Sequence, residues 1–186
     1  MQYRKMGKWG VRLSAIGLGS YLTIGFKLDE QTSRETVRAA YEAGINFFDT
    51  ANAYNSGEAE RVLGKCLAEF PRSSLFVITK VFAPMGEGPN DRGLSKKHIF
   101  EQCEASLKRL GMDYVDLYMC HRPDPDTPLE ETVRAMEDLA RQGKIGAVKK
   151  GRDWWIDVEV FTAYLNTMLQ SEDGRAGPKP AQEETS

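Results

Sequence analysis

Four apolar segments of the chain each end on a polar residue, and each is followed by a stretch with helical periodicity. The end residues are Ser20, Asp49, Lys80 and His121, at intervals of 29, 31 and 41 residues. The segments are apolar throughout rather than alternating, which is typical of parallel strands that helices cover. Repetition of a strand and a helix at this spacing predicts an α/β protein with four βα units.

The helical stretches carry start and stop signals of their own. Ser95 is expected to be the N-cap of one helix, and Gly111 its end. In another helix, Thr127 as N-cap, Pro128 in the first helical position and Glu130 predict a capping box. The expected helices occupy residues 29–44, 56–70, 95–111 and 127–143.

Two architectures fit four successive βα units, a (β/α)8 TIM barrel and an open doubly wound sheet. No GxGxxG turn follows any of the apolar segments, which disfavours the dinucleotide-binding form of the open sheet. A barrel is the better interpretation, preceded by an N-terminal β-hairpin around the turn at residues 8–10. A complete barrel needs about 250 residues. The 186 residues of this chain therefore predict a partial barrel.

A four-stranded part of a barrel has two strand edges without partners, and such edges tend to pair with another chain. We expect two chains to form a homo-oligomer through these edges, or the C-terminal segment to cover a flattened sheet. In either case the bare edges argue against a well-behaved monomer.

Composition limits the partners and the compartment. The formal net charge is −2, so the overall charge does not predict a nucleic acid or an anionic membrane as partner. There is no apolar run long enough to cross a bilayer and no signal-peptide core at the N-terminus. The cysteines Cys66, Cys103 and Cys120 are odd in number and form no CxxC, which predicts reduced thiols in a cytoplasmic protein and no metal site.

Three of the strand ends carry a carboxylate, an ammonium and an imidazole, at Asp49, Lys80 and His121, and Tyr54 lies in the loop after the first of them. In a barrel the carboxyl ends of the strands converge on one mouth, where active sites lie. There, Lys80 would stabilise the anion of a proton-donating phenol, Asp49 would hold the lysine, and His121 would position a carbonyl oxygen. Each residue alone is more often structural, as a cap, a solvated charge or a packing group. Their joint placement favours a function.

Three stretches resemble the aldo-keto reductases: "FFDTANAYNSGEAERVLGK", "VITKV" and "LYMCHRPDPDTPLEETVRAM". The similarity is greatest to the branch that includes the voltage-gated potassium channel β-subunits and their bacterial relatives, and it covers about residues 1–145. It implies a TIM barrel that reduces a small carbonyl substrate with hydride from NADPH.

The resemblance also implies roles for individual residues. Asp49, Tyr54, Lys80 and His121 match the catalytic tetrad of the family, with Tyr54 as the proton donor. For the cofactor, NADP, the resemblance implies contacts with Asp49 and with Ser20 and Tyr21, which stand where the family has a Gly-Thr-Trp segment. The channel β-subunits carry an asparagine in place of His121, so on this point the chain is more similar to the reductases.

The resemblance ends near residue 145. The family's later residues, which hold the cofactor's pyrophosphate and 2′-phosphate, have no counterpart in this sequence. We therefore expect a partial barrel at 1–145, a divergent C-terminal β-turn-helix segment at 146–170 and a disordered tail at 171–186.

The divergent segment resembles, weakly, the wing and last helix of an excisionase-like or MerR-like winged helix-turn-helix domain. Lys149, Lys150 and Arg152 would then contact phosphates. The plainer interpretation, a strand–turn–strand and a helix at 158–169 that pack on the core, is preferred, and binding of nucleic acid is disfavoured.

The sequence leaves three functions open. The first is an NADPH-dependent aldo-keto reductase, either active or truncated and inactive. The second is a non-catalytic, truncated or regulatory relative, because everything after residue 145 diverges. The third, DNA binding, depends on the C-terminal segment alone.

Overall fold

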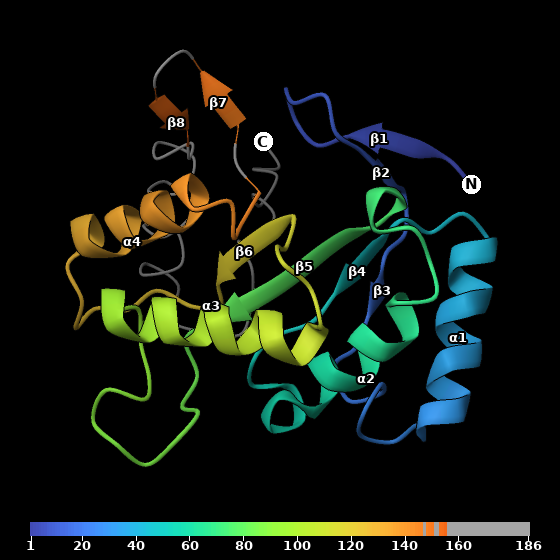
Figure 1. The fold of residues 1–186 in the computed structure, drawn as a ribbon, viewed down its shortest axis with the longest axis horizontal. Coiled ribbons are helices and arrows are strands. Elements are labelled where there is room, and N and C mark those ends of the chain that lie inside the picture. The colour runs from blue at the N-terminus through green and yellow to red at the C-terminus, as the bar shows by residue number, and fades with distance from the viewer. Residues whose placement is uncertain (147, 151–152, 156–186) are drawn as a thin grey trace, which may run out of the picture.

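The computed structural model describes residues 1–146, 148–150 and 153–155. Figure 1 shows the arrangement of the helices and strands. The strands are β1 (Tyr3–Lys5), β2 (Arg12–Ser14), β3 (Leu18–Gly19), β4 (Phe47–Asp49), β5 (Phe76–Val81), β6 (Leu117–Cys120), β7 (Val148–Lys150) and β8 (Asp153–Trp155). The α-helices are α1 (Glu30–Glu42), α2 (Glu58–Leu67), α3 (Lys96–Leu110) and α4 (Leu129–Arg141), with short 3₁₀ turns at η1 (Tyr54–Gly57) and η2 (Arg72–Ser74).

Strands β3, β4, β5 and β6 form one parallel sheet in chain order. The helices lie together on one side of this sheet (Figure 1). A doubly wound sheet would carry helices on both faces, whereas strands in chain order with helices on one face form the wall of a barrel. The described part of the chain is thus a partial (β/α)8 barrel, as the repeat predicted.

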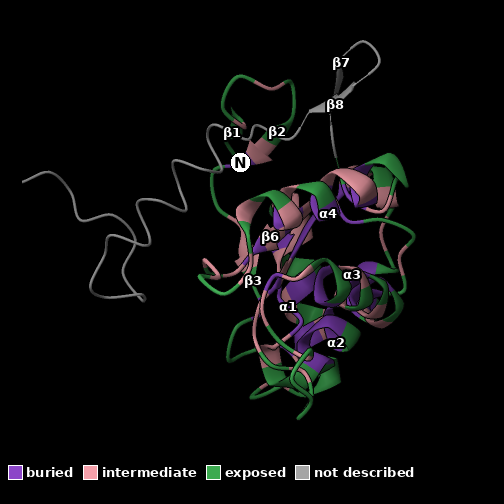
Figure 2. Ribbon diagram, turned by 90° about the vertical axis from the view of Figure 1, so that its left-hand side faces the viewer, coloured by how far each residue is buried: buried purple, intermediate pink, exposed green. Residues whose placement is uncertain are grey.

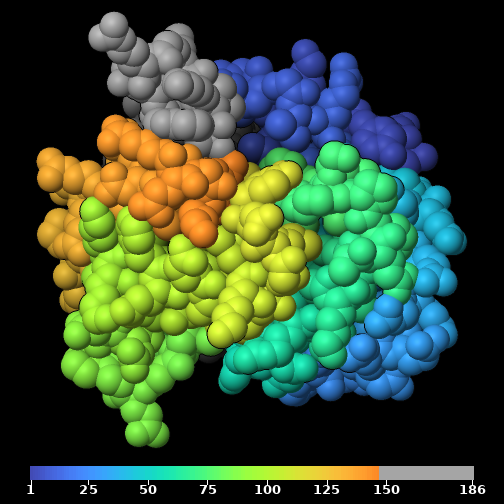
Figure 3. Space-filling view, viewed as in Figure 1, coloured from blue at the N-terminus to red at the C-terminus, as the bar shows by residue number. Residues whose placement is uncertain are grey.

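The core lies between the sheet and the helices. Alternate strand residues face the helices and are buried, among them Phe48, Val77, Val81 and Tyr118. Figure 2 shows the buried residues gathered on the strands and on the inner sides of α2 and α3. Consecutive helices also contact one another, and in Figure 3 they follow in chain order across the surface, from blue α1 to orange α4.

The predicted N-terminal hairpin is present and is fixed at the amino ends of the sheet strands. Strands β1 and β2 pair antiparallel. The backbone N–H of Ser14 donates to Asn46 Oδ1 at 2.8 Å, just before β4, and the Tyr3 hydroxyl donates to the carbonyl of Gly44 at 2.9 Å. The carboxyl ends of the strands, where the candidate site lies, are at the opposite end.

The sequence signals for helix ends are confirmed for α3 but not for α4. Ser95 caps α3 by accepting from the N–H of His98, and Gly111 ends it in the left-handed conformation. The capping box predicted for α4 is wrong. That helix begins at Leu129, after Pro128, without a side-chain cap. The hydroxyl of Thr127 donates to Asp124 Oδ2 at 2.8 Å, in the loop before the helix.

After α4 the chain passes along the edge of β6. Ile145 forms a bridge with Val115, and the N–H of Gly146 donates to the Val115 carbonyl at 2.8 Å. Strands β7 and β8 then pair antiparallel, a feature that the wing and the strand–turn–strand interpretations share. The expected helix at 158–169 and tail at 171–186 lie outside the described residues. Among the described residues, no helix is long and apolar enough to span a membrane.

Candidate active site

Three neighbouring strands bring Asp49, Lys80 and His121 to one end of the sheet. Asp49 is the last residue of β4 and pairs with Ile78 of β5. Lys80 follows Ile78 by two residues and therefore points to the same face, away from the helices. His121 comes directly after β6, and its N–H donates to the carbonyl of Val81 at 2.8 Å. The predicted convergence of these side chains thus follows from the parallel register.

The ammonium group of Lys80 lies at the centre of the site. It donates to Asp49 Oδ1 at 2.6 Å, to the Thr50 carbonyl at 2.9 Å and to the Tyr54 hydroxyl at 3.2 Å. Only 12% of the Lys80 side chain is exposed. The three protons of the ammonium therefore have three protein acceptors, and the cation is held in one place.

Tyr54 reaches this cation from a sharply bent corner, η1. Asn55 and Ser56 have φ values of 47° and 52°, and Gly57 follows at 87°. The left-handed region is costly for a residue with a Cβ atom, least so for asparagine. The side-chain amide of Asn55 donates to the carbonyl of Gly25, which holds the corner against the loop after β3. Strained backbone of this kind tends to be kept at functional sites.

Two aromatic rings flank the ring of Tyr54. The His121 ring meets it edge-on, with centroids 5.7 Å apart and planes at 74°. The Tyr21 ring lies 4.9 Å from it, and Tyr21 itself is 61% exposed. Burial lowers the pKa of His121 below its ordinary value, and the positive charges of Lys80 and Arg122 lower it further. The imidazole is therefore neutral at pH 7 and can donate one hydrogen bond.

Ser20 adjoins this group through the backbone. Its N–H donates to the Asp49 carbonyl at 2.9 Å. The side chain is 1% exposed, and its Oγ atom has no hydrogen-bond partner among the described residues. A buried hydroxyl without a partner requires an explanation, and a bound polar ligand is one. The structure thus places all six predicted residues at the carboxyl ends of the strands, and the tetrad side chains lie within one cluster.

Two features of the site were not predicted from the sequence. The first is the Thr50 carbonyl, which accepts from Lys80. Every residue has a backbone carbonyl, so the sequence does not indicate which one will serve as an acceptor. The second is Glu60 of α2, which is fully buried behind the site. A signal existed for Glu60, since it is in phase with the apolar residues Leu63 and Leu67 of its helix.

Comparison with known proteins gives a consistent result. The sequence profile described as "Aldo/keto reductase family" matches residues 15–149. A protein of Arabidopsis thaliana described as a probable voltage-gated potassium channel subunit beta is 46% identical over 145 residues, which are 77% of this chain and 44% of that protein. A protein of Oryza sativa subsp. japonica with the same description is 49% identical over 145 residues, with the same shares covered. The chain thus spans less than half the length of these curated relatives.

A solved structure has the same fold. It is the crystal structure of a thermostable aldo-keto reductase in complex with the inhibitor epalrestat. It superposes with a TM-score of 0.68 at 36% sequence identity and covers 78% of this chain, whereas this chain covers 52% of it.

Proposed function

The chain belongs to the aldo/keto reductase family, and from this membership we propose that its site reduces the carbonyl group of an aldehyde or ketone with NADPH. Tyr54 is the proton donor in this proposal. The observation that carries it is the hydrogen bond of 3.2 Å from the Lys80 ammonium to the Tyr54 hydroxyl. A phenol in contact with a fixed cation is suited to give up a proton to an oxygen that becomes negative.

Each of the four side chains has a distinct task in the reaction. NADPH, when bound, supplies the hydride for the carbonyl carbon. Tyr54 gives its hydroxyl proton to the carbonyl oxygen, and Lys80 stabilises the phenolate that remains. Asp49, 2.6 Å from the ammonium, holds Lys80 in place. The neutral His121 donates a hydrogen bond to the carbonyl oxygen and orients it beside the phenol.

The residues present fit the nicotinamide end of the cofactor. The carboxamide of nicotinamide has both a donor and an acceptor, and the buried Ser20 Oγ is free, among the described residues, to bond to either. The exposed ring of Tyr21 provides an aromatic surface beside Tyr54. Ser20, Tyr21 and Asp49 are therefore the residues that would hold this end of NADPH.

The compartment and the association state are further parts of the proposal. A cytoplasmic location is supported by three buried cysteines that form no disulfide, Cys66, Cys103 and Cys120. Pairing of two chains through the sheet edges is supported by a sheet that ends at β3 and β6 in the described part of the chain. Sedimentation equilibrium tests this pairing, and a monomer at all concentrations contradicts it.

A second candidate function is a binding protein without turnover. It is favoured by one observation, that two relatives at 46% and 49% identity are described as probable voltage-gated potassium channel β-subunits. Such a protein could keep the tetrad geometry without a complete cofactor site.

Titration of the purified chain with NADPH, followed by the fluorescence of the dihydronicotinamide, separates the two candidates. The reductase proposal expects saturable binding in the micromolar range that NADP⁺ displaces, and weaker binding by Ser20→Ala. The absence of binding at millimolar NADPH contradicts the reductase proposal and leaves the binding protein.

A further inference from the structure

The carboxylate of Glu60 joins three elements behind the candidate active site. Glu60 belongs to α2 and is fully buried. Its Oε1 atom accepts a hydrogen bond from Thr79 Oγ1 of β5 at 2.5 Å. Its Oε2 atom accepts from Arg109 Nε of α3, also at 2.5 Å. A buried charge is tolerated only where such partners replace its hydration. Glu60 therefore ties α2 to both β5 and α3.

Each of the two partners of this carboxylate adjoins a segment that carries a member of the tetrad. Thr79 precedes Lys80 on β5 and faces the helices, so its bond fixes the strand immediately behind the ammonium. Arg109 packs against Gly57, the last residue of the corner that begins with Tyr54. A Cβ atom built on Gly57 would lie only 2.6 Å from Arg109 Cδ. The carboxylate of Glu60 thus supports the strand through its hydrogen bond from Thr79, and the corner through its ion pair with Arg109.

We propose that Glu60 is a positioning residue, which sets the separation of the Tyr54 hydroxyl and the Lys80 ammonium by holding their two elements together. Apolar side chains could join α2, α3 and β5 equally well if packing were the only requirement. Charged hydrogen bonds also fix the relative orientation of the elements they join, which apolar packing does less strictly. Orientation matters here because a misplacement of about 1 Å at a reacting group can cost about 100-fold in rate. The catalytic consequence rests on the proposed function, whereas the geometric one does not.

The test removes one bond and keeps the ion pair. Thr79→Val has nearly the shape of threonine but cannot donate to Glu60, whereas Thr79→Ser keeps the hydroxyl. The protein is labelled with ¹³C at its tyrosine rings, and the Tyr54 signals are assigned by their loss in Tyr54→Phe. We expect Thr79→Val to displace the Tyr54 signals and Thr79→Ser to restore them. The signals of Tyr41, on α1, should stay in place in both variants.

A second control separates positioning from general loosening of the network. Ser106→Ala removes the bond of 3.1 Å from Arg109 Nη2 to Ser106 Oγ and leaves the Glu60 bonds intact. It should not displace the Tyr54 signals. With an aldehyde as substrate, Thr79→Val should lower kcat by about 10- to 100-fold with little change in KM, and Thr79→Ser should recover most of it. Should the valine variant fail to fold, Thr79→Cys gives the same comparison, since a thiol is a weak donor.

The outcomes that overturn the inference are distinct from failure of the proposed function. Tyr54 signals that coincide in Thr79→Val and the unmodified chain overturn it, as do equal displacements in Thr79→Val and Thr79→Ser. A chain that binds no NADPH and reduces no aldehyde contradicts the proposed function instead, and the tyrosine signals still decide the role of Glu60.

Discussion

The ammonium group of Lys80 donates a hydrogen bond of 3.2 Å to the hydroxyl of Tyr54, although 26 residues separate the two along the chain. Two elements of different kinds create this contact. Lys80 is fixed by the register of a parallel strand, and Tyr54 by a corner in the left-handed conformation. In the proposed reaction this contact places a cation beside the phenol that loses its proton.

Lys80→Met should reduce carbonyl reduction by about 100-fold or more, because the phenolate loses its stabilising charge. Lys96→Met is the matched control. Lys96 also forms an ion pair of 2.6 Å, with Asp138, but on the exposed surface of α3. Its loss should leave the rate unchanged. Equal rates of aldehyde-dependent NADPH oxidation in the two variants would contradict the role of Lys80.

The two histidines should make the protein less stable as the pH falls below neutrality. Burial lowers the pKa of both His98 and His121 below the ordinary value of 6.5. Below pH 6.5 the unfolded chain therefore binds more protons at these histidines than the folded chain does, and the free energy of unfolding decreases. The stability that each neutral histidine contributes is fully present above pH 6.5. It is lost as the pH falls through the pKa of that histidine in the folded chain.

Urea denaturation at pH 7.5, 6.5, 5.5 and 5.0 measures this effect. His121→Asn should show a smaller decrease over this range than the unmodified chain, because one of its two histidines is gone. A decrease of the same size in both proteins would contradict a lowered pKa of His121 in the folded chain.

Gly57→Ala should destabilise the protein more than Gly111→Ala. Both glycines have positive φ, 87° and 66°, so each alanine costs about 1 to 2 kcal/mol of backbone strain. A Cβ atom at Gly111 meets nothing within 4 Å, whereas at Gly57 it would displace the Arg109 side chain. Overpacking of this kind adds about 1 to 3 kcal/mol. Equal urea midpoints for the two variants would contradict the close packing of Arg109 on the corner.

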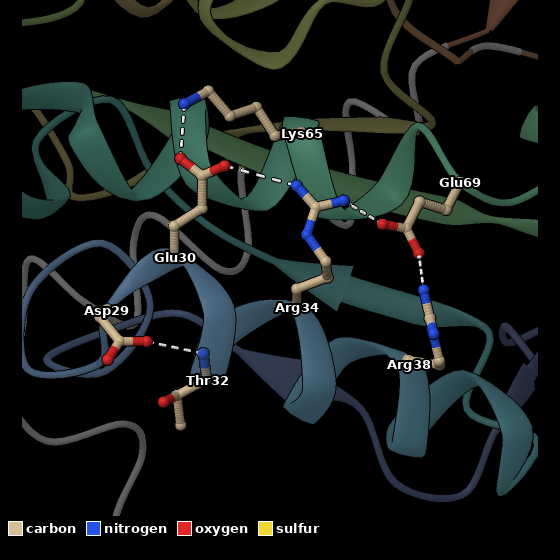
Figure 4. A network of polar contacts seen from close by, with 7 residues as sticks. All are labelled: Asp29, Glu30, Thr32, Arg34, Arg38, Lys65 and Glu69. Carbon is tan, nitrogen blue, oxygen red and sulfur yellow. Dashed lines mark hydrogen bonds and ion pairs between the residues drawn. The ribbon is translucent and has the colours of Figure 1, made fainter.

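The exposed ion pairs that join α1 to α2 and to the residues just after α2 should contribute far less to stability than the buried pair of Glu60. Glu69 contacts Arg34 and Arg38, and Glu30 contacts Lys65 (Figure 4). Exposed pairs are screened by salt and lose side-chain entropy. Glu69→Gln should therefore shift the urea midpoint slightly at low salt and not at all in about 1 M NaCl.

Glu60→Gln is the buried counterpart of this variant. It should lower the stability by about 3 to 5 kcal/mol at either salt concentration, because Arg109 is left without its counter-charge. A similar response of the two variants to substitution and to salt would contradict the burial of Glu60.

The convergence of three members of the tetrad could be predicted from the sequence because it depends only on chain order and strand direction. Asp49, Lys80 and His121 end successive apolar segments, and parallel strands bring such ends to one edge. The α4 cap could not be predicted in the same way. Thr127 has the right spacing for a capping box, but the helix begins one residue later than predicted, with Pro128 as its N-cap, and the Thr127 hydroxyl contacts Asp124 of the preceding loop.

Glu60 shows a second limit of sequence reasoning. A charged residue on a helix is expected to be exposed unless a partner for its charge is known. The partner of Glu60, Arg109, lies on another helix, so the sequence does not reveal it. The register of Glu60 with Leu63 gives a hint, yet only the packing of α2 on α3 shows that this carboxylate is buried and paired.

The most direct test of Tyr54 as the proton donor is aldehyde-dependent oxidation of NADPH by the unmodified chain and by Tyr54→Phe, with the binding of NADPH measured for both. Phenylalanine keeps the ring between Tyr21 and His121 and removes only the hydroxyl proton. Tyr54→Phe should bind NADPH and unfold at the same urea concentration as the unmodified chain, but lose carbonyl reduction. Reduction that continues at the same rate in Tyr54→Phe would contradict the assignment of Tyr54 as the proton donor.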